Sequence, residues 1–314
     1  MRSRAEKKKQ FRNALLASAI SLLTAGIIVL VTVLCFNTGL LITVLIFAIS
    51  FAFALAILII LWKKTDLIRN LMYCFHCIKY PESSRKYYCP CCGRKLAGFT
   101  DMKYYEDPER FDPSRFMRQR QDVICPFCYS APRQRILASW GNNNIQLLRN
   151  SKILYFAPEY SMMKWFRRNN ISLTTADLYD TAADLKLDIT NISLPDGSYD
   201  IVIANHVLEH VSSYQKALYE LNRILRPNGM LLVSFPINTD LDTVAEGGDN
   251  TSEDRIRLFG QNDHVRIFGN DSSSLLRSFE FTVNEIELAD IGENILPVTG
   301  PADYDSNRLF ICVK

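Results

Sequence analysis

The apolar residues of this chain follow two different patterns, and the first occupies its N-terminal fifth. Residues 14–36 and 40–62 contain no charged side chain, and each run is 23 residues long. A helix of that length crosses a hydrocarbon core of about 30 Å. Asn37-Thr38-Gly39 between the runs favours a turn. The pattern predicts a two-helix transmembrane hairpin over 14–62. The alternative, a cleaved signal peptide, has an apolar stretch of only about 7–15 residues.

The second pattern begins near residue 150, where short apolar runs alternate with segments of helical periodicity. Alternation of this kind predicts an α/β fold with a doubly wound parallel sheet. Such a sheet binds ligands outside the carboxyl ends of its strands, where the strand order reverses. We expect strands over 152–157, 171–178, 187–189, 199–205, 230–235, 281–288 and 308–313, and helices over 133–148, 162–169 and 213–225.

Charge divides the chain in a similar way. Residues 1–70 carry nine Lys and Arg against two Asp and Glu, residues 71–150 carry thirteen against seven, and the rest carries fourteen against twenty-four. Basic residues flank both apolar runs, whereas the loop between the runs has none, so the positive-inside rule places both flanks in the cytoplasm. The sequence therefore predicts a multi-pass protein of the inner (cell) membrane, whose basic N-terminus (1–13) and C-terminal domain are cytoplasmic. Attraction to anionic lipid explains the basic clusters better than nucleic-acid binding does.

Six of the nine cysteines form three Cys-x-x-Cys pairs, which are typical of metal ligands in a reducing compartment. A tetrahedral structural zinc takes two such pairs. Cys89 and Cys125 share a Cys-Pro start, which favours Cys89, Cys92, Cys125 and Cys128 as the ligand set. The other choice joins the first pair, Cys74 and Cys77, to Cys89 and Cys92. The segment 71–130 is thus predicted to be zinc-ribbon-like, with residues 131–150 as a linking helix before a domain over 151–314.

Polar residues follow several of the expected strands and are candidates for ligand binding. Asp177 lies 20 residues past the first strand-helix turn, where a carboxylate can accept hydrogen bonds from both ribose hydroxyls of an adenosine ligand. Asp188 and Ile189 are placed to hold an adenine, through its exocyclic amine and its ring face respectively. The full set of strand-end candidates is Ala157, Pro158, Glu159, Asp177, Leu178, Asp188, Ile189, Asn205 and His206.

A series of motifs resembles the class I S-adenosylmethionine-dependent methyltransferases, in particular the type 11-like branch. The motifs are Leu-Asp-Ile-Thr at 187–190, Leu-Pro-Asp-Gly-Ser-Tyr-Asp at 194–200, Asn-His-Val-Leu-Glu-His-Val at 205–211 and Leu-Arg-Pro-Asn-Gly at 225–229. The resemblance covers about residues 150–314. It implies a Rossmann-like sheet of seven strands with the last one antiparallel. It also implies that Asp177 binds the ribose, Asp188 and Ile189 the adenine, and Asn205 and His206 the methionine part.

The first turn departs from the usual family pattern. Family members have an acidic residue and a Gly-x-Gly turn after the first strand, whereas this chain has Phe-Ala-Pro-Glu at 156–159 without glycine. A bacterial subgroup with this turn, preceded by Cys-Pro-x-Cys knuckles, is similar to this chain. Ala157 is the next smallest residue to glycine, and Glu159 is placed to pair with the ammonium of the ligand.

The predicted activity is methyl transfer from S-adenosylmethionine to an acceptor at the cytoplasmic face of the membrane. A hydroxyl acceptor needs a general base. The candidates are His210, Glu209, His206 and His264, of which His264 and His210 are preferred, with Arg266 to steer an anionic group. The membrane location favours an envelope saccharide or a lipid-linked precursor. Two alternatives are a non-catalytic membrane adaptor with a degenerate domain and an RNA methyltransferase. The second lacks the interleaved aromatic and basic residues expected for binding single strands.

Overall fold

The computed structural model describes residues 65–102, 120–247, 250–259, 261–286, 288–292, 294–295 and 308–314. The chain forms two compact units, Met1–Ile78 and Lys79–Lys314. The basic N-terminus (1–13) and the hairpin predicted over 14–62 lie outside the described residues. Within the described part of the chain, no helix has both the length and the apolar character needed to span a membrane.

The described part of the first unit is helix α3 (Thr65–Lys79). Its sequence has no internal Gly or Pro, and it ends just before Pro81, which cannot continue a helix. Cys74 on this helix is exposed and Cys77 is half-buried. Large apolar side chains on the same helix are exposed to solvent, namely those of Leu71, Met72, Phe75 and Ile78.

The second unit begins with two small antiparallel hairpins. Strands β1 (Tyr87–Cys89) and β2 (Arg94–Leu96) form the first, and β3 (Thr100–Met102) and β4 (Arg120–Ile124) form the second. A short 3-10 helix, η2 (Glu82–Ser84), precedes them. Each hairpin adjoins one of the Cys-Pro knuckles, so the fold of this segment serves to bring the two knuckles together.

A seven-stranded sheet forms the centre of the second unit, in the order β12-β13-β9-β8-β5-β6-β7. The neighbouring pairs from β9 to β7 are parallel, and only β13 runs antiparallel to its neighbours. The α/β class and the antiparallel last strand are thus confirmed. The strands are β5 (Ile153–Phe156), β6 (Thr174–Asp177), β7 (Leu185–Lys186), β8 (Tyr199–Asn205), β9 (Leu225–Ser234), β12 (Thr282–Ile286) and β13 (Leu309–Val313).

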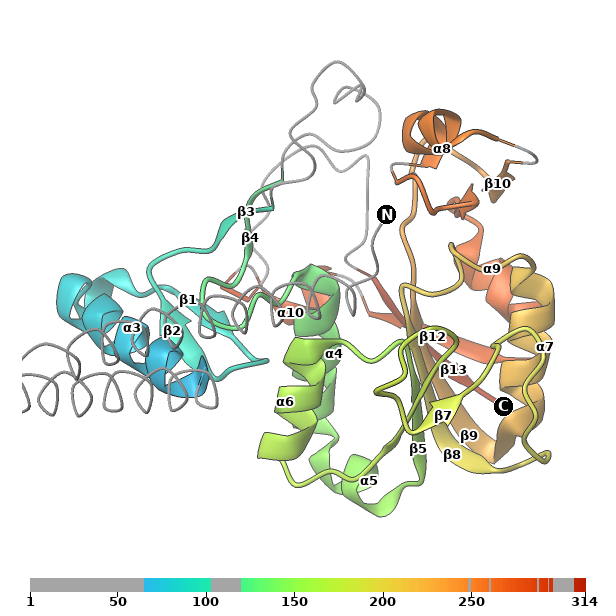
Figure 1. Cartoon of the computed structure of the whole chain (residues 1–314), viewed down its shortest axis with the longest axis horizontal. Coiled ribbons are helices and arrows are strands. Elements are labelled where there is room, and N and C mark those ends of the chain that lie inside the picture. Colours follow the sequence, from blue (N-terminus) through green and yellow to red (C-terminus); the bar gives the residue numbers. More distant parts are fainter. Residues whose placement is uncertain are drawn as a thin grey trace, which may run out of the picture. The chain divides into compact units, whose positions relative to one another are not determined.

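Helices cover both faces of this sheet (Figure 1). On one side lie α4 (Pro132–Asn143), α5 (Ile145–Asn150) and α6 (Tyr160–Arg168), and on the other α7 (Tyr214–Ile224) and α9 (Ser272–Arg277). The apolar face of α7 packs into the main core with Leu218 and Leu221 fully buried. The connection after β9 contains β10 (Ala245–Glu246), α8 (Ser252–Phe259) and β11 (Arg266–Ile267), and α10 (Leu288–Ile291) follows β12.

Three expected elements differ from the structure. The helix expected over 133–148 is interrupted at Asn144, whose φ and ψ of −123° and 26° are not helical. The third strand lies at 185–186 rather than 187–189, because Leu187 and Ile189 turn into the core instead of pairing with β6. The strand expected over 230–235 begins at Leu225, and residues 226–229 form an irregularity within it, because the register with β8 passes from Leu225 to Met230.

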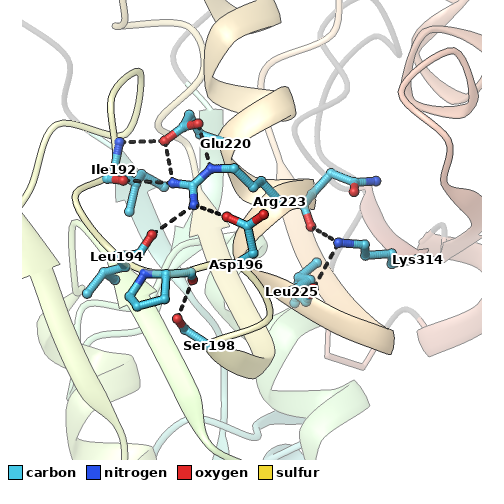
Figure 2. A network of polar contacts seen from close by, with 10 residues as sticks. Ile192, Leu194, Asp196, Ser198, Glu220, Arg223, Leu225 and Lys314 are labelled. Carbon is cyan, nitrogen blue, oxygen red and sulfur yellow. Dashed lines mark hydrogen bonds and ion pairs between the residues drawn. The ribbon is translucent and has the colours of Figure 1, made fainter.

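A half-buried arginine, Arg223, fastens the loop before β8 to α7 (Figure 2). Arg223 donates two hydrogen bonds to Glu220, at 2.9 and 2.8 Å, and one to Asp196 at 2.6 Å. It also donates to the carbonyl oxygens of Ile192 and Leu194, each at 2.8 Å. All five N–H donors of the guanidinium are therefore used. The loop that follows Asp188 and Ile189 is thereby held in one position.

Replacing Arg223 by Ala should lower the free energy of unfolding by about 2 kcal/mol. The change removes a donor from each of the carbonyls of Ile192 and Leu194, and it leaves the Glu220 carboxylate with only the backbone N–H of Ile192. Chemical denaturation of the purified chain measures the change. Arg257→Ala is the matched control, since its pair with Asp254 is solvent-exposed and should contribute no more than about 1 kcal/mol. Equal losses in the two variants would contradict this reading.

Candidate functional site

The strand order of the sheet reverses between β5 and β8. From β5 the chain moves outward through β6 to β7 and then returns to β8, on the other side of β5. The carboxyl ends of β5 and β8 therefore flank a crevice of the kind in which open α/β sheets bind ligands. This reversal brings Ala157, Pro158 and Glu159 beside Asn205 and His206, which are five of the predicted cofactor-binding residues.

Two residues at these strand ends adopt the left-handed backbone conformation. Ala157 has φ of 48° and donates its N–H to the carbonyl of Ala176 at 2.9 Å, whereas His206 has φ of 55° and donates to the carbonyl of Ser234 at 2.8 Å. This conformation costs a non-glycine residue about 1–2 kcal/mol, and such strain is concentrated at ligand sites. Ala157 thus adopts the backbone conformation that glycine favours, although the turn contains no glycine.

Substitutions at Ala157 test the importance of this conformation. Ala157→Gly should preserve ligand binding, because glycine adopts a positive φ without strain. Ala157→Val should lower stability by about 1–2 kcal/mol and weaken binding of S-adenosylhomocysteine about tenfold or more, because a branched side chain is strained here and narrows the crevice. Calorimetric titration of both variants measures the difference, and similar affinities would count against a close backbone approach.

Glu159 is held by side chains from three elements. Its Oε1 accepts hydrogen bonds from Arg133, at 2.9 Å, and from Gln134, both on α4. Its Oε2 accepts from Tyr155 at 3.3 Å and from Asn205 at 2.6 Å. These donors use the roughly four acceptor sites of the carboxylate. The expected contact between Glu159 and a ligand ammonium therefore requires one of these donors to leave, and in the structure Glu159 instead fixes Asn205.

Asp177 ends β6 with one carboxylate oxygen engaged. Its Oδ1 accepts from the backbone N–H groups of Tyr179 and Asp180 at 2.7 and 2.8 Å. No described residue donates to Oδ2, and the side chain is only half-buried, as is that of Leu178. The backbone contacts orient the carboxylate, so that Oδ2 is available for the hydroxyls of a ligand.

Asp188 and Ile189 lie in the loop after β7. Asp188 Oδ1 accepts from the backbone N–H and hydroxyl of Thr190 at 2.8 and 2.7 Å. Ile189 is 5% exposed and belongs to the main apolar core. Little of the Ile189 side chain is therefore left for an adenine ring, in contrast to the expectation that it packs on one.

A second group of side chains follows β8. Glu209 is fully buried, and it is approached by Nδ1 of His206 at 3.2 Å and by Nε2 of His210 at 3.9 Å. The His264 ring lies against His210, with ring centroids 4.7 Å apart. Burial lowers the pKa of His264 to about 4. Burial alone would raise the pKa of Glu209, but the surrounding histidines, His206 first, lower it to about 2.

The candidate catalytic residues differ in accessibility. The His210 side chain is 34% exposed, whereas His264 and Arg266 are 1% and 2% exposed. Arg266 donates to the carbonyls of Leu208, Val211 and Ser212 and pairs with Glu246 at 2.7 Å. This corrects the expectation that Arg266 steers an anionic group, because its guanidinium is engaged in holding the segment after β8.

The Cys-Pro knuckles converge in the structure. The four Sγ atoms of Cys89, Cys92, Cys125 and Cys128 all lie within 4.8 Å of one another. The closest pairs are Cys89–Cys128 at 3.6 Å and Cys92–Cys125 at 3.8 Å, and tetrahedral ligands at a Zn–S distance of about 2.3 Å would be about 3.8 Å apart. This donor set fits a zinc ion. Cys74 and Cys77 are on α3 and outside this group of four.

The two knuckles share their backbone geometry. The N–H of Gly93 donates to the carbonyl of Cys89 at 2.7 Å, and that of Tyr129 to Cys125 at 2.9 Å. Both residues have positive φ, 71° and 59°. Tyrosine thus occupies in the second knuckle the strained position that glycine takes in the first. The buried Arg135 of α4 donates to the carbonyls of Val123 and Ser130, each at 2.7 Å, and fixes the backbone on either side of the second knuckle.

Several contacts of the site were not predicted from sequence. Arg133, Gln134 and Tyr155 orient Glu159, and Glu209, one of the candidate bases, lies at the centre of the histidine group. Arg133 and Gln134 precede the domain that carries the family motifs, so the spacing of those motifs does not point to them. Glu209 lies within the Val-Leu-Glu-His motif, but its contact with His264 joins residues 55 positions apart in the chain.

Comparison with known proteins supports the methyltransferase resemblance. Residues 145–233 match the family described as methyltransferase domain, type 11. The chain is similar in structure to an S-adenosylmethionine-dependent methyltransferase of Archaeoglobus fulgidus (12% identity, 58% of this chain and 94% of that one, TM-score 0.38). It is also similar to 1,6-didemethyltoxoflavin-N1-methyltransferase of Burkholderia thailandensis (14%, 68% and 99%, 0.39). No curated protein matches the chain in sequence. The segment with the strand reversal thus matches a methyltransferase-domain family.

Proposed function

We propose that this protein transfers a methyl group from S-adenosylmethionine to an acceptor. The family match over residues 145–233 carries the proposal, because that segment contains the strand reversal between β5 and β8 and the polar residues at the strand ends. S-adenosylmethionine, when bound, supplies a methyl group on a sulfonium centre for in-line displacement. The protein's part is then chiefly to position the two reactants.

The described residues suggest a division of tasks within the crevice. Asp177 would accept the ribose hydroxyls through Oδ2, and Asp188 the adenine amine. Ala157 and Pro158 would form the wall next to the ligand, with Leu178 beside the adenosine. Asn205, held by Glu159, and His206, held by Glu209, would line the methionine end. Among the expected bases, His210 is the one with an exposed imidazole and could reach an acceptor.

We propose further that Cys89, Cys92, Cys125 and Cys128 bind a structural zinc ion. Four thiolates leave no open coordination position for chemistry. The buried cation of Arg135 would offset part of the negative charge of such a centre, and burial of this guanidinium lowers its pKa while the neighbouring cysteines oppose that change. The zinc would stabilise the fold rather than take part in the reaction.

The location and the acceptor are proposals from the sequence alone. The apolar runs 14–36 and 40–62, with basic flanks, support a two-span anchor in the inner membrane and a cytoplasmic methyltransferase domain. An acceptor near the bilayer, such as an envelope saccharide or a lipid-linked precursor, would suit that location. Reporter fusions at each end and in the 37–39 loop test the topology, since only the loop should be periplasmic.

Calorimetric titration with S-adenosylmethionine and S-adenosylhomocysteine tests the function. Saturable binding of both, followed by transfer of labelled methyl groups to components of a membrane extract, is the expected result. Absence of heat with either ligand would overturn the proposal and favour the adaptor alternative, which is motivated by the glycine-free first turn.

A further inference from the structure

The side chains of Glu209, His210 and His264 form a compact group, called here the Glu-His-His cluster. One donor atom from each residue lies within 4.8 Å of the donor atoms of the other two. Glu209 and His210 follow β8, whereas His264 lies just before β11 in the connection after β9. The backbone holds the two segments together, because Val265 donates its N–H to the carbonyl of Glu209 at 2.9 Å.

Three buried atoms at the centre of the cluster, Glu209 Oε1 and Oε2 and His264 Nε2, lack a hydrogen-bond partner among the described residues. Glu209 is fully buried, yet neither carboxylate oxygen has a hydrogen-bond donor among the described residues, although His206 Nδ1 lies 3.2 Å from Oε1. His264 is 1% exposed, and its Nε2 is also buried without a partner in the described part of the chain. A buried carboxylate without donors is costly, and native proteins rarely leave one in that state. A cation bound between these side chains would supply the partner.

Each histidine of the cluster has its Nδ1 near an oxygen of the connection after β9, which leaves its Nε2 available to an ion. His264 Nδ1 is 2.8 Å from the carbonyl oxygen of Phe259, which fixes the proton on Nδ1 and leaves the lone pair on Nε2. His210 Nδ1 lies 3.6 Å from Asp263 Oδ2, and its Nε2 is 3.9 Å from Glu209 Oε1. Metal-ligating histidines are commonly oriented by an outer hydrogen bond of this type.

We propose that the Glu-His-His cluster binds a divalent transition-metal ion. Two imidazole nitrogens and one carboxylate oxygen form a donor set that suits Zn²⁺, Co²⁺, Mn²⁺ or Fe²⁺. Three protein ligands leave at least one position open, and the exposed side of His210 gives that position access to solvent. The proposed ion is separate from the four-cysteine zinc, which is coordinatively closed.

The open coordination position of the proposed ion could also bind the methyl acceptor. A divalent ion lowers the pKa of a bound hydroxyl or water, so an oxygen acceptor bound there would release its proton to solvent water at the exposed side of His210 and would need no protein base. His206 belongs both to the crevice and to the surroundings of Glu209, so the cluster adjoins the proposed cofactor site. This second step rests on the proposed methyl transfer, whereas metal binding itself does not.

Titration of the zinc-loaded, full-length protein with Co²⁺ tests the site, because zinc first fills the cysteines. The expected result is about one further equivalent of Co²⁺ with visible d–d absorption and no thiolate charge-transfer band. Glu209→Gln and His264→Gln should each weaken Co²⁺ binding at least about 100-fold, and Asp263→Asn, which alters only an outer contact, about tenfold. His76→Gln, on α3 and outside the cluster, is the matched histidine control and should bind as the unaltered protein does.

The unaltered protein alone can decide the question if a variant does not fold. Absence of a further Co²⁺ equivalent, or binding that survives both Glu209→Gln and His264→Gln, would overturn the proposal. Titration of the same samples with S-adenosylhomocysteine separates the two hypotheses. If Co²⁺ does not bind but S-adenosylhomocysteine does, the metal site is refuted and the proposed function is unaffected. If Co²⁺ binds but S-adenosylhomocysteine does not, the proposed function is refuted and the metal site is unaffected.

Discussion

Asp177→Asn is expected to weaken binding of S-adenosylhomocysteine at least about 100-fold, since each hydrogen bond between a ligand and a charged group contributes about 1.5–3 kcal/mol. Asparagine preserves the local turn, because its side-chain oxygen can still accept from Tyr179 and Asp180. It replaces the second carboxylate oxygen with an amide, which cannot accept a ribose hydroxyl. The measured loss would therefore report the ligand contact rather than a disturbed fold.

Asp180→Asn is the matched control for this experiment. Asp180 belongs to the same exposed loop, and its carboxylate accepts only the backbone N–H of Ala182, at 2.9 Å, among the described residues. Affinity should change less than about twofold. Calorimetric titration of both variants, with unfolding curves to verify their stability, gives the comparison. Equal affinities for Asp177→Asn and the unaltered protein would remove Asp177 from the proposed site.

Cys125→Ser is expected to remove about one zinc equivalent and to destabilise the second unit severely. Structural zinc contributes about 10–16 kcal/mol to the folding of small domains, and a serine hydroxyl is a poor replacement for a thiolate ligand. Elemental analysis against the unaltered protein measures the zinc, and thermal unfolding measures the stability. A strong chelator should have the same effect on the unaltered protein.

The control comes from the other knuckle, Cys89–Cys92. Cys91 is buried and donates to the carbonyl of Gln134 at 3.3 Å, but it does not belong to the four-cysteine group. Cys91→Ser can keep that hydrogen bond, so it should retain the zinc and cost far less stability. If Cys91→Ser lost zinc and Cys125→Ser kept it, the ligand assignment would be wrong.

The local sequence pattern predicted correctly those strands whose side chains are buried on both faces of the sheet. Strand β8 has the predicted bounds, 199–205, because most of its residues are fully buried and a strand covered on both faces is apolar throughout. The two-residue β7 was misplaced, because Leu187 and Ile189 contribute to the core from a loop. The stretch at 226–229 reads locally as a turn, and in the structure it forms an irregularity within β9, because the register with β8 passes from Leu225 directly to Met230.

Site residues could be predicted where they belong to a motif or end a strand. Contacts between residues far apart in the sequence could not be predicted. The strand ends at Ala157, Asp177 and Asn205 follow from the sheet topology. The four donors that occupy Glu159 do not, because two of them come from a helix before the first strand of the sheet. The burial of Arg266 depends in the same way on carbonyls more than fifty residues earlier in the chain.

Helix α4 joins two parts that the sequence divides into separate domains. Its successive residues serve different neighbours: Gln134 binds Glu159 in the crevice, whereas Arg135 binds the backbone around the second knuckle. One rigid turn of helix thus sets the position of both, in agreement with their place in a single compact unit, Lys79–Lys314. The boundary at residue 150 is therefore not a usable point of division. A truncated or fused version of the domain proposed to bind the cofactor would therefore need to include the segment with Cys89, Cys92, Cys125 and Cys128 in order to fold.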